Sequence, residues 1–152
     1  MKKLFTIFCV LLLALPLAVA DLGPDMKEKN LEVAQLHVDW QELRILVGMQ
    51  TTIQYVDELG GDTTNLESLR DSFQSLADET VSTRDELTAL NSEKREVTSS
   101  FKEDAVSQVT DLGGDLDVLR ERIESARDES PDVQAAKEAF VAKMQEVILG
   151  RV

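Results

Sequence analysis

The chain has little of the side-chain chemistry on which enzymes depend. Its one cysteine is Cys9, within an N-terminal apolar run, and its one histidine is His37. A Cys–His nucleophilic pair is excluded in the chain that remains once the expected leader containing Cys9 is removed. A di-iron bundle needs a Glu-x-x-His motif from each of two helices, which one histidine cannot supply. Neither a Gly-x-Ser-x-Gly elbow nor a glycine-rich phosphate loop is present. We predict that the protein is not an enzyme, has no catalytic residues and uses no cofactor.

The sequence also lacks the spacings that metal sites require. His37 lies next to Leu36 at the edge of an apolar helix stripe, where a boundary residue is expected and not a metal ligand. The Gly113-Gly114-Asp115 stretch is acidic, but it lacks the Asp-x-Asp-x-Asp-Gly order and the distant glutamate of a calcium loop. The other carboxylates are scattered around the helices, as on solubilising faces. No metal site is predicted.

The first 20 residues have the layout of a secretory signal peptide. Two lysines precede an apolar run from Leu4 to Leu15, and Ala18-Val19-Ala20 is the small-residue pattern that signal peptidase cleaves. The run is short for a membrane span of about 20 residues, and Cys9 lacks the small residues that precede a lipoprotein cysteine. We predict cleavage after Ala20, a periplasmic or extracellular location, and no stable membrane anchor afterwards.

Acidic residues outnumber basic ones in the expected mature chain. The full sequence has 16 basic and 29 acidic residues, and loss of the two N-terminal lysines would bring the net charge from −13 to −15. Such a surface repels nucleic acid and favours solubility or a basic partner. Residues 21–152 are enough for a single domain, and without a cysteine they form no disulfide.

Glycine and proline are few, and apolar residues recur at three- and four-residue spacing between them. This pattern predicts four helices, over residues 26–59, 64–112, 115–129 and 131–149. The second would be the long central helix, because no glycine or proline falls between Leu66 and Leu112. Its heptad seam contains the following apolar residues: Leu66, Leu69, Phe73, Leu76, Leu87, Leu90, Val97 and Phe101.

The string Leu-Gly-Gly-Asp occurs twice, at residues 59–62 and 112–115. Glycine ends helices because it adopts the left-handed C-cap conformation, and aspartate caps the helix that follows. We therefore predict helix turns at Gly60, Gly61, Asp62, Gly113, Gly114 and Asp115. Thr64 with Glu67 forms an expected capping box. The repeat reflects either duplication of a hairpin or convergence on the same turn chemistry.

These signals predict an all-α fold, an elongated antiparallel helical bundle or coiled coil of three to four helices. The competing arrangement keeps residues 26–59 and 64–112 collinear and builds a parallel oligomer. Gly48 interrupts the apolar stripe of the first helix, which indicates a local bend or a close approach.

The function that fits is an exported, non-enzymatic helical interaction or structural module of the cell envelope. Polar seam residues at Thr80, Thr83 and Lys94 leave room for a protein partner or for self-association through the helical seams. Trp40 and Phe140 are the candidate partner contacts, with core packing as the ordinary role of Trp40. The last helix is the most apolar, which favours core or oligomer contacts there. The alternative is a periplasmic holdase-like chaperone with helical arms.

Overall fold

The computed structural model describes the backbone of residues 24–150 and the side chains from residue 28 onward. Of this part, 86% is helical and none is strand, so the all-α prediction is confirmed. The predicted leader and its cleavage site lie outside the described residues. The five helices of the described part are α2 (Pro24–Glu58), α3 (Thr64–Ala77), α4 (Arg84–Asp111), α5 (Leu116–Glu129) and α6 (Pro131–Leu149).

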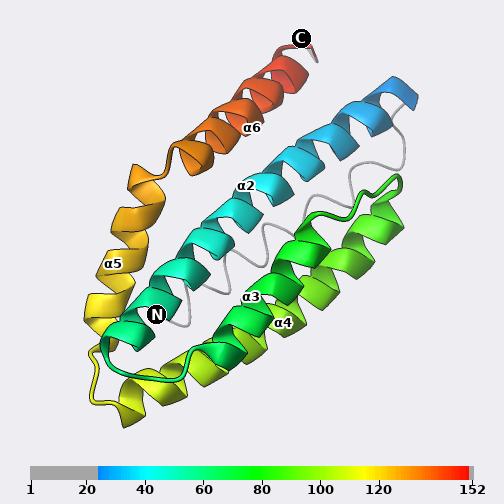
Figure 1. Ribbon diagram of the computed structural model, residues 1–152. Coiled ribbons are helices and arrows are strands. Elements are labelled where there is room, and N and C mark those ends of the chain that lie inside the picture. The colour runs from blue at the N-terminus through cyan, green and yellow to red at the C-terminus, as the bar shows by residue number, and fades with distance from the viewer. Residues whose placement is uncertain (1–23, 151–152) are drawn as a thin grey trace.

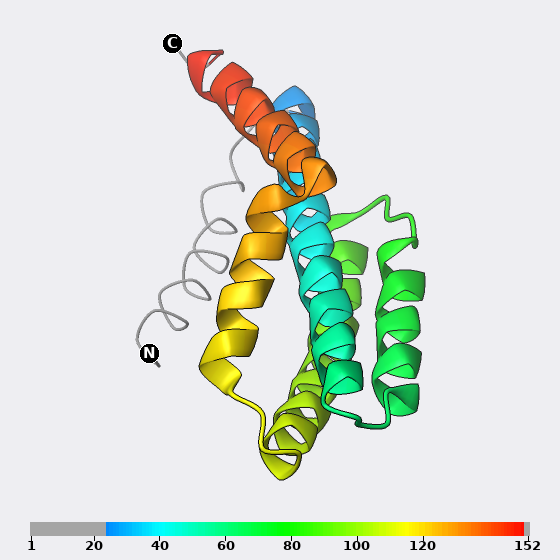
Figure 2. The ribbon, with the colours of Figure 1, turned by 60° about the vertical axis from the view of Figure 1, so that its left-hand side comes forward.

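The first of these helices, α2, occupies the centre of the molecule. It packs against each of the other four helices. The hairpin of α3 and α4 covers one side, and α5 followed by α6 covers the other (Figures 1 and 2). Consecutive helices joined by a turn run in opposite directions, whereas α5 and α6 follow one another along α2 (Figure 1). The long helix that organises the fold is therefore α2, with 35 residues.

The expectation of one continuous helix over residues 64–112 is wrong. The helix ends at Ala77, the chain reverses through residues 78–83, and α4 runs back beside α3. Thr83 is the extended N-cap of α4: its hydroxyl accepts from the Glu86 N–H at 3.2 Å, and the Glu86 carboxylate accepts from the Thr83 N–H at 3.1 Å. This capping box, together with the β-branched Thr80 and Val81, favours a new start over continuation.

Both Leu-Gly-Gly-Asp segments lie at chain reversals with the same backbone hydrogen bonds. Gly60 has φ +80° and Gly113 has φ +74°, the left-handed conformation that glycine adopts without strain. The N–H of the following glycine then donates back to Val56 O in one turn and to Val109 O in the other, at 2.9 and 2.8 Å. This pairing is the Schellman motif, which satisfies the last carbonyl groups of a helix.

The residues after these glycines cap the next helix in different ways. Asp115 accepts from the backbone N–H groups of Asp117 and Val118, so it is a true N-cap of α5. Asp62 accepts from the Thr64 N–H at 3.0 Å, but the N-cap of α3 is Thr63. The expected Thr64–Glu67 capping box does not form, because the Thr63 hydroxyl donates to Glu67 instead.

The core lies where α2 is enclosed by α3, α4 and α5. Its fully buried side chains are Val56, Leu66, Phe73 and Val109. The seam residues Leu87, Leu90 and Phe101 are also buried, although their helix is broken. At Gly48 α5 comes close: a Cβ there would lie 2.9 Å from the Arg127 guanidinium, whose Nε donates to Arg44 O. The expectation of a close approach at Gly48 is confirmed.

Candidate functional site

The helix α6 and the first half of α2 form a two-helix arm. Helix α6 begins at Pro131, because the Ser130 hydroxyl caps it by accepting from the Val133 N–H and proline is favoured in the first turn. Its helix partners are α2 and, at the junction, α5. Val133 and Val147 are buried, and Lys143 binds the carboxylate of Glu32 at 2.9 Å. The arm extends beyond the part of the molecule that α5 covers (Figure 2).

Three rings join the two helices of the arm. The Trp40 and Phe140 rings are stacked, with centroids 5.8 Å apart, and the His37 ring lies 5.0 Å from Phe140 and 5.9 Å from Trp40. The Arg44 guanidinium lies 5.5 Å from the centre of the Trp40 ring. Partial burial lowers the pKa of His37 below its ordinary value of 6.5. The two candidate partner contacts, Trp40 and Phe140, are thus brought together and contact each other.

A second apolar surface on α6 lies next to the face that packs on α2, since Met144 is one helix turn after Phe140. Val141, Met144 and Ile148 follow the spacing of three and four residues that places side chains on one helix face, and we name them the α6 stripe. Their exposed fractions are 38%, 37% and 54%, and that of the adjacent Leu149 is 70%. The helix therefore has two adjacent apolar faces, one packed on α2 and one open to solvent.

The predicted polar seam residue Lys94 lies in the interior. Its ammonium group forms a buried ion pair with Glu42 of α2. Burial raises the pKa of Glu42, and the hydrogen bond from Lys94 opposes that shift. Both residues of the pair line a pocket of about 410 Å³, and Gln35, which also lines it, donates from its side-chain amide to Val81 O at 3.2 Å. The pair connects α4 to α2.

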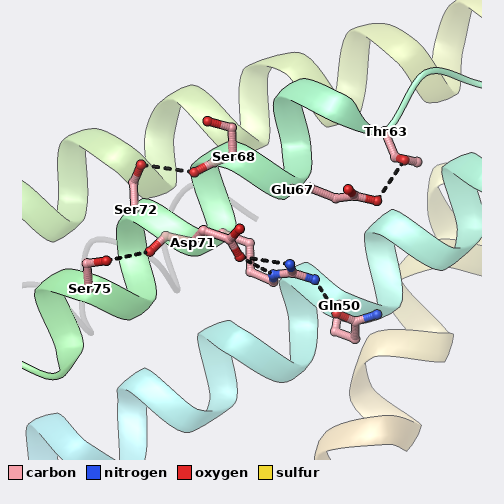
Figure 3. A network of polar contacts seen from close by, with 8 residues as sticks. Gln50, Thr63, Glu67, Ser68, Asp71, Ser72 and Ser75 are labelled. Atoms are coloured by element: carbon pink, nitrogen blue, oxygen red, sulfur yellow. Dashed lines mark hydrogen bonds and ion pairs between the residues drawn. The ribbon is translucent and has the colours of Figure 1, made fainter.

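A hollow on the outer face of α3 is lined by polar side chains: Thr64, Glu67, Ser68, Asp71, Ser72 and Ser75. Figure 3 shows the hydroxyls of Ser72 and Ser75 turned back toward their own helix, where they donate to Ser68 O and Asp71 O. Arg70 bridges the Asp71 carboxylate and the Gln50 amide at 2.8 Å. The polar groups are satisfied locally, as on a solvated helix face.

The described residues also bear on metal binding and on membrane crossing. Between residues 24 and 150 no cluster of His, Cys, Asp and Glu side chains has the arrangement of a metal site. None of the described helices combines the length and the apolar character that crossing a membrane requires.

No protein-family model, curated protein sequence or solved structure matches this chain. Sequence reasoning placed Trp40 and Phe140 on apolar stripes, but it did not pair them. It assigned Met144 and Ile148 to the packed stripe, and the signal for the open side was Val141, which lies off the packed face.

Proposed function

We propose that this chain is an exported, non-enzymatic helical module that binds another protein chain through the α2–α6 arm. The observation that carries the proposal is the α6 stripe, because helix faces open to solvent are ordinarily polar. Val141, Met144 and Ile148 expose more than a third of their surface on one face of a helix whose adjacent face is already packed. Contiguous exposed apolar side chains with a polar surround mark protein interaction sites.

The proposal includes the location and the packing that the sequence indicates. The leader at residues 1–20 directs export, and the acidic surface keeps the released chain soluble. The helices pack as an elongated antiparallel bundle with coiled-coil character around α2. In support, the seam residues Leu66, Phe73 and Phe101 are buried against it.

Export and binding are tested together in cells that produce the full sequence. A photoreactive residue replaces Ile148 in one variant and the exposed Ser99 of α4 in a matched control. Mass measurement of the exported form is expected to give Asp21 as its first residue. Cross-linking is expected to give a discrete adduct from position 148 and none from position 99. Equal adducts from both positions, or a chain retained in the cytoplasm, would count against the proposal.

A holdase-like chaperone is the alternative, and one observation favours it. Apolar side chains are also exposed at the opposite end of the molecule, where Leu112, Leu116 and Val118 each expose 39% of their surface. Several separate apolar patches suit unfolded clients, which present many weak sites. Suppression of aggregation of a reduced, unfolding client at equimolar chain would favour the holdase, and loss of that effect in Leu116→Lys would place it at this end.

A further inference from the structure

We propose that the partner of the α6 stripe is a second copy of this chain, bound antiparallel, so that two arms form a four-helix bundle about a two-fold axis. This inference rests on the proposed function and narrows its partner to the chain itself.

The arm lacks the enclosure that the rest of the fold gives to α2. Around its second half, α2 is covered by three helices, and Met49, Ile53 and Val56 are at most 5% exposed. Before Gln35, where the reversal at residues 78–83 first contacts α2, α6 is the main covering helix, and the apolar side chains Leu31 and Val33 of α2 are half-buried. A helix pair has two seams of this kind, and a second pair placed across it closes both.

The charges favour contact through the arm over contact through the body. Residues 59–130 contain 18 acidic and eight basic side chains, whereas the arm, residues 24–41 and 131–149, contains seven acidic and four basic ones. Two copies that meet through their bodies bring like charges together, which opposes association. Within the face of the α6 stripe the charged residue is Lys137, Glu138 lies at its edge, and the flanking Gln134 and Gln145 are neutral. The arm is thus the surface on which two acidic chains approach with the least repulsion.

The same charges set the direction of the pairing. A contact between identical surfaces is isologous and closes with two-fold symmetry. In a parallel pair the two acidic bodies would lie side by side, while in an antiparallel pair they lie at opposite ends of a longer rod. The antiparallel arrangement places Met144, in the middle of the stripe, near the symmetry axis.

The mass in solution of the purified chain, produced from its full sequence, gives the first test. The mass expected is that of two chains, shifting to one chain in Met144→Glu because a buried unpaired carboxylate opposes the contact. The matched control is Val106→Glu on α4, since Val106 is 39% exposed and Met144 37%. Val106→Glu is expected to remain two chains, and added salt is expected to tighten the pair by screening repulsion. Circular dichroism checks that both variants keep their helix content.

Single cysteines on the otherwise cysteine-free part of the chain test the geometry. Met144→Cys is expected to oxidise to a covalent dimer, and Val118→Cys is expected to stay monomeric. A one-chain mass at all concentrations, or Val118→Cys dimers with none from Met144→Cys, would overturn the inference. A one-chain mass combined with the adduct from position 148 in cells means that the arm binds a different protein, so the proposed function survives and this inference fails. Binding of the one-chain form to neutral vesicles would overturn both.

Discussion

Leu59 packs into the space left by the missing side chain of Gly114, and the contact is reciprocated. A Cβ on Gly114 would lie 2.5 Å from Leu59 Cδ1, and a Cβ on Gly61 would lie 2.8 Å from Leu112 Cδ1. Each Leu-Gly-Gly-Asp turn therefore packs its leucine against the second glycine of the other. This gives a physical reason for the repeated string that holds whether it arose by duplication or by convergence.

The reciprocal contact predicts that Gly114→Ala destabilises the fold although its backbone conformation tolerates a side chain. The new methyl group would also meet Val109 Cγ1 at 2.9 Å, so we expect a cost of about 1–3 kcal/mol, as for other overpacked interiors. In a Leu59→Ala background the cost is expected to fall, because the clash is relieved. Urea unfolding of the parent chain, the two single variants and the double variant measures this coupling.

A control shows whether the coupling is specific. Val147→Ala on α6 shortens a buried side chain at a distant place, and its effect is expected to add to that of Gly114→Ala. If the cost of Gly114→Ala is the same with leucine or alanine at position 59, the reciprocal contact is not what excludes a side chain there.

Much of the helical layout was predictable because the signals are local. Gly60 and Gly113 end helices through their own backbone, and Ser130 with Pro131 starts one, so short-range chemistry decides each case. The break after Ala77 was missed because it has no glycine or proline, and the heptad continues across it. Its signal was Thr83 followed by Glu86 three residues later, a capping box that competes with helix continuation.

The reversal at residues 78–83 predicts a short distance between two exposed serines. Ser68 and Ser100 are near one level of the α3–α4 hairpin, since the Asn65 amide donates to Asp104 at 3.2 Å. One continuous helix would hold them about 48 Å apart at about 1.5 Å per residue. Spin labels on Ser68→Cys and Ser100→Cys are expected to give a distance below about 25 Å, since packed helix axes lie about 10 Å apart. A label-to-label distance distribution centred near about 48 Å would show instead that residues 64–112 form one continuous helix.

The Glu42–Lys94 pair predicts a strongly non-additive double-mutant cycle. Glu42→Leu alone leaves the Lys94 ammonium buried without its carboxylate, at an expected cost of about 3–5 kcal/mol. The double change Glu42→Leu with Lys94→Met removes both charges and is expected to be close to neutral. Thermal unfolding of the single and double variants measures the difference. Costs that simply add would show that the two side chains do not depend on each other.

The same pair gives a pH dependence of defined sign. Burial raises the pKa of Glu42 in the folded chain, so the folded state binds this proton more readily than the unfolded state. The carboxyl therefore lowers stability as the pH rises from its unfolded pKa through its folded pKa. Lys94→Met removes the hydrogen bond that opposes the shift, so the variant is expected to lose more stability over this range than the parent chain. If the stability of Lys94→Met and that of the parent chain change equally with pH over this range, the expectation is contradicted.

The candidate site was less predictable than the helices, because its features depend on how distant segments meet. The position of Lys94 on a seam suggested a polar gap, but its burial depends on Glu42, 52 residues earlier. Trp40 and Phe140 are 100 residues apart, and no local pattern pairs them. The exposure of the α6 stripe depends on how α6 lies along α2, which no local sequence pattern sets.

His37 offers a direct measure of how tightly the arm is closed. It is the one histidine in the sequence, so its imidazole signals are resolved without assignment, and burial is expected to hold its pKa below 6.5. The unfolded chain then binds a proton on His37 more tightly than the folded chain does. The stability associated with His37 is present above about pH 6.5 and is lost as the pH falls through the folded pKa. Phe140→Ala opens the arm beside the ring, so His37 is expected to titrate closer to 6.5 there. Val118→Ala, at the other end of the molecule, is expected to leave the titration unchanged. A parent pKa at or above 6.5, or an equal pKa in Phe140→Ala, would show that the ring is not enclosed between Trp40 and Phe140.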